Sequence, residues 1–244
     1  MIIIGHRGAK GEAPENTLEG FLHAYENGIR HFELDVQISS DGELVVHHDS
    51  TLKRTANEKG RTYQHTAEML GRMDARHNTP PWHMPTPIPT LRSILEALPD
   101  ALSFQLEVKG TSRARMTAIQ NALMMLLTPR ERERCAVTSS HFNWIARLKH
   151  GDPGLKTGVV VEYAWEQPIE RLRQTRADIL VLNHHLCTPA RVNSAHKMGR
   201  EVSVWTVNDV YRAMALQNMG VDSLITDYPT HMQKAFAQHL PEPR

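Results

Sequence analysis

An alternation of short apolar runs with longer segments of helical spacing continues from one end of this chain to the other, and it limits the fold more than any other feature. The apolar runs predict eight strands, at residues 2–4, 31–36, 103–108, 135–138, 157–161, 179–182, 201–207 and 223–225. The segments between them predict eight helices, at residues 16–27, 91–98, 112–127, 142–150, 168–175, 189–198, 210–219 and 229–239. Eight such units in 244 residues favour a closed α/β barrel of the (β/α)8, or TIM, type over an open, doubly wound sheet.

Local signals mark the start of several of these helices. Asn16 is a favourable N-cap residue and Glu19 follows three positions later, which is the spacing of a capping box. Prolines stand where a first helical turn tolerates a missing N–H group, at positions 168, 189 and 229. No GxGxxG or GxxxxGK[ST] phosphate loop occurs in the sequence, which argues against a nucleotide-binding fold.

One segment, residues 41–89, interrupts the alternation. It begins with a strand-like run at residues 44–47 and continues with polar sequence and five prolines. We interpret it as a small insertion after the second strand, an excursion that stands over the carboxyl-terminal mouth of the barrel, where this fold places its active sites. Because it looks too short and too polar to hold a core of its own, we expect residues 1–244 to form one domain.

Composition excludes several classes of protein. Lys and Arg total 28 and Asp and Glu total 27, so the net charge is +1. This charge is not that of a strongly basic nucleic-acid-binding protein. No apolar run approaches the roughly 18 residues of a membrane span, so no membrane insertion is expected. Cys135 and Cys187 show no CxxC spacing, and the first residues do not form a secretory signal. We therefore expect a cytoplasmic protein, with the choice between monomer and homodimer left open.

Charged residues interrupt two of the predicted strands. Glu33 and Asp35 are two positions apart, so strand alternation places both carboxylates on one face. Glu107 and Lys109 repeat this arrangement at the end of the following barrel strand. Carboxylates gathered in a covered site repel one another unless a cation lies between them. Oxygen ligands and the absence of an HExxH motif favour Mg²⁺ or Ca²⁺ over zinc.

Two histidines fall at strand ends beside this carboxylate cluster. His6 and Arg7 follow the first strand, and His48 follows the run that opens the excursion. A single histidine in a chain that has fifteen is more often a surface or core residue. Two of them beside one cluster, however, form a candidate general acid/base pair. Strand alternation would point His47 and His48 in opposite directions, and the spacing alone leaves the choice between them open.

Seven motifs in order resemble those of the glycerophosphodiester phosphodiesterases, over residues 5–229. They are His6-Arg7-Gly8, Pro14-Glu15-Asn16-Thr17, Glu33-x-Asp35, Asp41-Gly42 through Val45-Val46-x-His48-Asp49, Glu107-x-Lys109, Trp205-Thr206-x-Asn208 and Thr226-Asp227-Tyr228-Pro229. The sequence departs from the family at Leu44, where the family usually has proline. This difference affects the geometry of a turn and changes no catalytic residue.

The resemblance implies a TIM barrel with an insertion after its second strand, and it implies roles for individual residues. His48, rather than His47, would form the acid/base pair with His6. Glu33, Asp35 and Glu107 would hold the divalent cation. Arg7 and Lys109 would hold the phosphate of the substrate.

The function expected from these residues is metal-dependent hydrolysis of small glycerophosphodiesters to sn-glycerol 3-phosphate and an alcohol. No serine, threonine or cysteine stands out as a nucleophile, so the 2-hydroxyl of the substrate's own glycerol would attack and form a cyclic 1,2-phosphate. Trp205 would form a wall beside the glycerol moiety or pack in the barrel mouth. The alternatives are a lysophospholipase D that uses the same centre, and a metal-binding barrel without catalysis.

A few other residues of these motifs look structural. Glu15 and Asn16 are interpreted as helix-start and turn residues, and Asp227 and Tyr228 as structural residues of the last turn.

Overall fold

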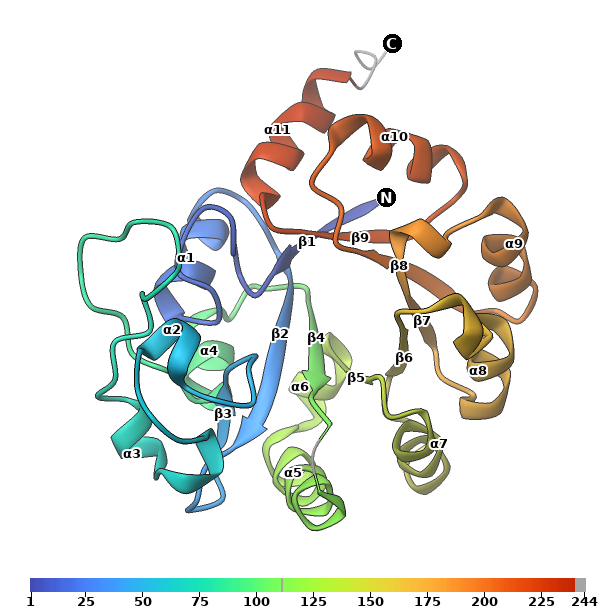
Figure 1. Ribbon diagram of the computed structural model, residues 1–244. Coiled ribbons are helices and arrows are strands. Elements are labelled where there is room, and N and C mark those ends of the chain that lie inside the picture. Colours follow the sequence, from blue (N-terminus) through green and yellow to red (C-terminus); the bar gives the residue numbers. More distant parts are fainter. Residues whose placement is uncertain (111, 240–244) are drawn as a thin grey trace.

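Eight parallel strands close into a barrel in the computed structural model, which describes residues 1–110 and 112–239 (Figure 1). Around the barrel these strands are β1 (Ile2–His6), β2 (His31–Ile38), β4 (Ser103–Val108), β5 (Cys135–Ser139), β6 (Thr157–Val161), β7 (Ile179–Asn183), β8 (Glu201–Trp205) and β9 (Ser223–Thr226). The ring closes because β1 pairs with both β2 and β9, with His6 opposite Glu33 and Ile4 opposite Ile225. The predicted (β/α)8 architecture is confirmed.

Helices surround the ring of strands on the outside (Figure 1). They are α1 (Leu18–Glu26), α4 (Leu91–Ala97), α5 (Arg113–Leu126), α6 (Pro129–Arg134), α7 (Phe142–Gly151), α8 (Pro168–Thr175), α9 (Pro189–Lys197), α10 (Val210–Asn218) and α11 (Pro229–His239), with short 3₁₀ turns η2 (Ala164–Glu166) and η3 (His184–Leu186). Helix α6 was not predicted, because its charged residues alternate without an apolar face. The Thr128 side chain caps it by accepting a hydrogen bond from the backbone N–H of Glu131. Within the described residues, no helix is both long and apolar enough to cross a membrane.

The prediction that Asn16 caps the first helix is wrong. Thr17 is the N-cap, and its Oγ1 accepts a hydrogen bond from the N–H of Gly20 at 3.1 Å. Asn16 instead adopts a left-handed backbone (φ 55°), and its side chain donates to Oδ2 of Asp35 at 2.8 Å. The side-chain oxygen of Asn16, which a cap would use as its acceptor, instead accepts from the backbone N–H of Asp35 at 3.4 Å. Another boundary also differs, since the strand predicted to end at residue 207 ends at Trp205.

The excursion lies on one side of the barrel, beside β2 and α1 (Figure 1). It contains β3 (Leu44–Val46), α2 (Lys53–Ala56), the 3₁₀ turn η1 (Thr62–Gln64) and α3 (Ala67–Leu70), with β3 antiparallel to the end of β2. The expectation that it is too polar to hold a core is wrong, because it buries an apolar cluster made of Val45, Leu52, Ala56, Leu70, Ala75 and Ile88. That residues 1–244 form one domain stays a prediction, and residues 111 and 240–244 of it lie outside the described residues.

Strand alternation divides the side chains of the barrel into two layers. On the outer face of β2, the Phe32 ring packs between Phe21 of α1 and Phe104 of β4, with centroid distances of 5.7 and 5.8 Å. A separate, smaller apolar cluster comes from the other face of the strands: Ile4, Ala136, Val160, Ile179, Val181 and Ile225. The same inner face of β2 carries Glu33 and Asp35, so charged groups project into a packed interior.

Candidate active site

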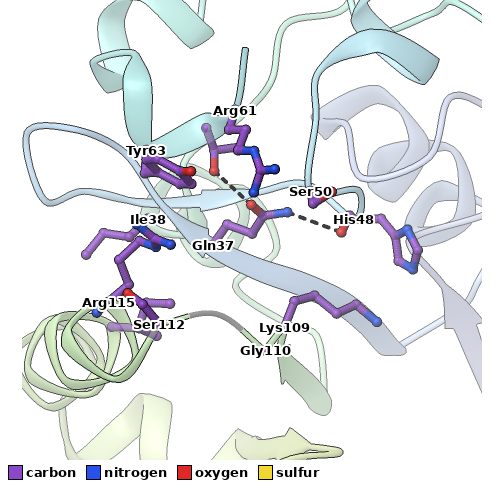
Figure 2. A pocket seen from close by; sticks show the side chains of 12 residues that line it. Gln37, Ile38, His48, Ser50, Arg61, Tyr63, Lys109, Gly110, Ser112 and Arg115 are labelled. Carbon is purple, nitrogen blue, oxygen red and sulfur yellow. Dashed lines mark hydrogen bonds between the residues drawn. The ribbon is translucent and has the colours of Figure 1, made fainter.

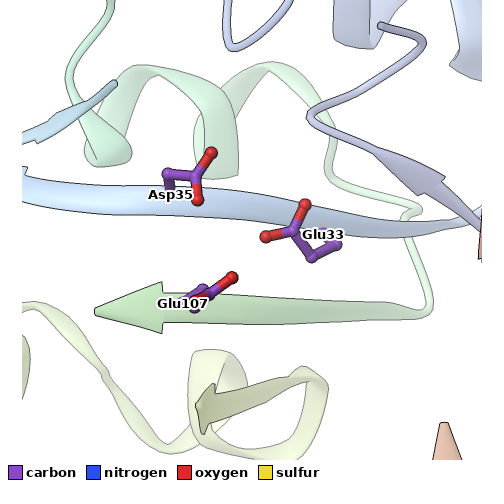
Figure 3. Close-up of side chains that lie close together, drawn as sticks. All are labelled: Glu33, Asp35 and Glu107. Atoms are coloured by element: carbon purple, nitrogen blue, oxygen red, sulfur yellow. The ribbon is translucent and has the colours of Figure 1, made fainter. Parts of the chain in front are cut away.

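Three carboxylates converge from two neighbouring strands, as predicted from their spacing. Glu33 and Asp35 lie on β2, and Asp35 stands opposite Glu107 in the register with β4. One oxygen from each lies within 4.8 Å of the others, and Figure 3 shows all three groups turned toward a common point. Glu33 and Asp35 are buried and Glu107 is half-buried.

Repulsion and burial shift the ionisation of this cluster. Burial and the charges of Asp35 and Glu107 raise the pKa of Glu33 well above its ordinary value. Burial is also the largest effect on Glu107, and it raises the pKa of that carboxyl. Burial acts on Asp35 in the same direction, but the cations Lys109 and Arg7 outweigh it and hold the pKa of Asp35 below its ordinary value. With all three groups ionised, the cluster would therefore carry more negative charge than its surroundings stabilise.

The donor set of this cluster fits a hard divalent cation. The ammonium of Lys109 already contacts two of the carboxylates, lying 2.9 Å from Asp35 Oδ1 and 2.8 Å from Glu107 Oε1. The third carboxylate has a buried oxygen, Glu33 Oε1, without a hydrogen-bond partner among the described residues. Three convergent carboxylates with one unsatisfied oxygen offer the all-oxygen site that Mg²⁺ or Ca²⁺ prefers.

Arg7 is held tightly against this cluster. Its backbone N–H donates to Glu33 Oε2 at 3.2 Å, and its Nε lies 3.0 Å from Asp35 Oδ2. Its Nη1 donates to Glu15 Oε1 at 2.8 Å. Arg7 adopts a left-handed backbone (φ 51°), a conformation that costs energy for a residue other than glycine and that these contacts maintain.

His6 lies at the end of β1, with both ring nitrogens near carboxylates. Its Nδ1 is 2.6 Å from Asp227 Oδ1, and its Nε2 is 3.8 Å from Glu33 Oε2. Asn208 in turn donates to the other oxygen of Asp227 at 2.8 Å. Burial lowers the pKa of His6, against the opposing effect of the hydrogen bond to Asp227. The interpretation of Asp227 as a structural residue therefore missed its contact with His6.

His48 comes from the excursion, just after β3. Its Nδ1 lies 2.7 Å from Asp49 Oδ1. Its backbone is fixed by Gln37, whose Nε2 contacts the carbonyl oxygens of His47, His48 and Asp49 at 2.8, 3.2 and 2.7 Å. Burial is the largest effect on His48 and lowers its pKa, although Asp35 acts in the opposite direction. His47 points elsewhere, since it is buried and its Nε2 lies 3.1 Å from the carbonyl oxygen of Thr51.

Arg54, on α2 of the excursion, connects Asp49, the neighbour of His48, with Glu15, the partner of Arg7. It donates to Asp49 Oδ2 at 2.6 Å and to the two oxygens of Glu15 at 2.8 and 2.7 Å. Burial opposes the ionisation of Glu15, but Arg54 and Arg7 outweigh it and lower the pKa of Glu15 to about 2. Glu15 thus has a larger part than the helix-start role predicted for it, and Arg54 was missed altogether.

All of the predicted site residues except Asp35, which is fully buried beside Glu107, line one cavity of about 450 Å³. Among the residues around it are His6, Arg7, Glu33, His48, Glu107, Lys109 and Trp205. Trp205 meets both descriptions offered for it, because it lines this cavity and also packs against the inner apolar cluster of the barrel. The arrangement places two histidines, each with a carboxylate at Nδ1, on the walls of a cavity that also holds a cation-binding cluster.

Comparison with known proteins agrees with this geometry. The model of the glycerophosphoryl diester phosphodiesterase family matches residues 6–231. Curated glycerophosphodiester phosphodiesterases of Bacillus altitudinis and Caldanaerobacter subterraneus are 31% and 30% identical to the chain, covering 95% and 93% of it and 96% and 94% of their own lengths. A phosphodiesterase of Oleispira antarctica, solved in complex with the product sn-glycerol-3-phosphate, superimposes with a TM-score of 0.83 at 27% identity, over 97% of each chain. The chain therefore belongs to the glycerophosphoryl diester phosphodiesterase family.

Proposed function

We propose that this phosphodiesterase hydrolyses small glycerophosphodiesters to sn-glycerol 3-phosphate and an alcohol, and that it does so with a divalent cation, Mg²⁺ or Ca²⁺. The observation that carries the proposal is the convergence of Glu33, Asp35 and Glu107 in the cavity that His6 and His48 also line. The product bound to the Oleispira relative supports the identity of the glycerol 3-phosphate half.

The three carboxylates would hold the cation. When bound, such an ion draws negative charge from the phosphate oxygens and makes a neighbouring hydroxyl more acidic. Three carboxylates outweigh a dication by one charge, and the phosphodiester adds another negative charge. Arg7 and Lys109 supply two compensating positive charges beside the cluster. These two charges would let an anionic substrate approach an acidic site.

His6 and His48 would serve as the acid/base pair. Asp227 and Asp49 accept hydrogen bonds from Nδ1 of the two rings, which leaves Nε2 of each ring to exchange protons with the substrate. One histidine takes the proton of the attacking hydroxyl while the other gives a proton to the departing alcohol oxygen. The two then exchange roles when water opens the product of the first step.

The attacking group would be the 2-hydroxyl of the substrate's glycerol. Among the described residues, the rings of His6 and His48 form hydrogen bonds with Asp227 and Asp49 and with no serine, threonine or cysteine. Burial raises the pKa of Cys135 to about 12 and also raises that of Cys187, so both thiols are poor nucleophiles. Attack by the 2-hydroxyl breaks the bond to the departing alcohol and leaves a cyclic 1,2-phosphate. Water then adds to this phosphorus and breaks the bond to the 2-oxygen.

A product assay tests the proposal. Purified protein is incubated with several glycerophosphodiesters in Mg²⁺, in Ca²⁺ and in chelator, and glycerol 3-phosphate is measured. We expect release with a divalent cation and none in chelator. Stabilisation by the cation without any hydrolysis would instead indicate a metal-binding barrel, and cleavage confined to lysophospholipids would indicate a lysophospholipase D.

A further inference from the structure

A second pocket adjoins the active-site cavity. It has a volume of about 210 Å³ and shares His48 and Lys109 with that cavity. From these two residues it extends between the end of β2, the η1 turn of the excursion and the start of α5, as Figure 2 shows. Because the two hollows share a wall, a phosphodiester held at His48 and Lys109 would direct one of its two substituents into each.

The charges around this pocket have one sign. Arg61 from the excursion and Arg115 from α5 line it together with Lys109. None of the described residues that line it is an aspartate or glutamate. Among these described residues a positively charged group would find no lining carboxylate, whereas hydroxyl or anionic groups would find cationic side chains.

The aromatic ring in this pocket is already covered. Among the described residues that line the pocket, Tyr63 supplies a phenol ring. The guanidinium carbon of Arg115 lies 3.9 Å from the centre of this ring. The guanidinium carbon of Arg61 lies 6.0 Å from the same centre. An aromatic face is what usually binds a quaternary ammonium group, and here a protein cation occupies it.

We propose that this pocket binds the departing alcohol of the substrate and that it favours hydroxyl-rich or anionic head groups over quaternary ammonium groups. The inference rests on the proposed function and adds its substrate class. The glycerol 3-phosphate half then lies in the larger cavity, beside Trp205, and the head group lies against Arg61, Arg115 and Tyr63.

Substrate preference gives the first test. The wild-type protein is assayed for glycerol 3-phosphate release from glycerophosphoglycerol, glycerophosphoinositol and glycerophosphocholine under identical conditions. We expect kcat/KM for the glycerol and inositol diesters to exceed that for the choline diester at least tenfold. An equal or higher value for the choline diester overturns the proposal.

Charge reversal in the pocket gives the second test. Arg61→Glu and Arg115→Glu are each expected to shift the ratio of kcat/KM values at least tenfold toward the choline diester. Arg72→Glu, in the excursion, and Arg113→Glu, at the start of α5, are matched controls, because both are exposed and neither lines the pocket. The controls are expected to keep the wild-type ratio, and thermal unfolding followed by circular dichroism shows whether each variant folds.

The outcomes separate this inference from the proposed function. If the pocket variants lower kcat/KM equally for all three diesters, the pocket contacts the shared glycerol 3-phosphate half, and the inference is wrong. If folded variants keep the wild-type ratio, the head group does not touch the pocket, and the inference is again wrong. If the wild-type protein releases no glycerol 3-phosphate from any diester, it is the proposed function that fails.

Discussion

Nδ1 of His6 lies 2.6 Å from Oδ1 of Asp227, although the two residues are 221 positions apart in the chain. Pairing of β1 with β9, the contact that closes the barrel, brings them together. The carboxylate fixes the orientation of the ring and favours the tautomer with the proton on Nδ1, so that Nε2 turns toward Glu33. His48 has the same relationship with its sequence neighbour Asp49.

Asp227→Asn tests the importance of this hydrogen bond. An amide can donate to Nδ1 and so favour the wrong tautomer of His6, which removes Nε2 as a proton acceptor. We expect kcat to fall by about 10²-fold. This is at the lower end of the loss of about 10²–10⁴-fold that we expect for His6→Ala. The cation affinity, measured by calorimetric titration, is expected to stay unchanged.

Asp222→Asn is the matched control for this variant. Asp222 also contacts a histidine ring nitrogen, 2.9 Å away on His196, but neither residue lines the active-site cavity. Unchanged kcat in Asp227→Asn, or an equal loss in both variants, would contradict the role given to Asp227.

The sequence predicts those parts of the site in which short-range periodicity determines geometry. Glu33 and Asp35 must share a face of a strand, and parallel pairing with the next barrel strand brings Glu107 beside them. The short spacing between these residues along each strand is therefore enough to predict the three-carboxylate cluster. The eight strands are also predictable from local sequence, since each is a short run rich in apolar and β-branched residues.

The missed residues act through partners that spacing does not reveal. Asp227 reaches His6 only through closure of the barrel, and Arg54 reaches Glu15 across 39 positions because the excursion brings α2 next to Glu15. Gln37 was overlooked although it shares the inner face of β2 with Asp35. Its acceptors are backbone carbonyls, which carry no signal in a sequence.

Glu33→Gln tests the cation site through stability as well as activity. The raised pKa of Glu33 means that its ionised form costs folding free energy, so the neutral amide is expected to raise the melting temperature of the protein in chelator. The same change is expected to remove activity and most of the stabilisation by Mg²⁺ or Ca²⁺, which is about 2.7 kcal/mol at a hundred times Kd. Thermal scans with and without cation measure both effects.

Glu68→Gln, an exposed change on α3, is the control for these scans. It is expected to keep the wild-type melting temperature in chelator and the wild-type response to cation. A Glu33→Gln protein that the cation still stabilises as strongly as it does the wild type would exclude Glu33 as a ligand.

Arg54→Met tests whether the excursion positions the site. Loss of the guanidinium removes one hydrogen bond to Asp49, which orients His48, and two to Glu15, which holds Arg7. We expect kcat to fall about 10–100-fold, as for other residues that orient catalytic groups, with little change in cation affinity. Arg54→Lys is expected to recover only part of the loss, because an ammonium does not reproduce the fork of contacts.

Arg76→Met supplies a matched control in the same excursion. Arg76 forms an ion pair with Asp74, with Nη2 2.7 Å from Oδ2, but contacts none of the site residues. Steady-state kinetics are expected to match the wild type for this variant. Equal kcat values for Arg54→Met and Arg76→Met would show that Arg54 does not position the site.

Glu15→Gln is expected to change the pH dependence of stability. The pKa of Glu15 is about 2 in the folded protein and near 4.5 in the unfolded chain, so the unfolded state binds its proton first as the pH falls. The ionised group therefore stabilises the fold above about pH 4.5, by roughly 3 kcal/mol, and loses this contribution as the pH falls toward 2. The deficit of Glu15→Gln in urea unfolding should be largest at pH 7 and shrink between pH 5 and 3. A deficit that does not change over this range would contradict the assigned ion pairs.

A substrate without the attacking hydroxyl gives the sharpest test of the reaction. In 2-deoxyglycerophosphocholine, hydrogen replaces the 2-hydroxyl, while the phosphate and the head group are the same as in glycerophosphocholine. If the 2-hydroxyl attacks the phosphorus, this compound should inhibit competitively and yield no choline. It lacks the attacking oxygen and the proton that a histidine would remove from it. With the natural substrate, phosphorus-31 spectra taken during single turnover should show a transient cyclic 1,2-phosphate. Release of choline from the deoxy compound at the normal rate would mean that water or a protein group attacks directly.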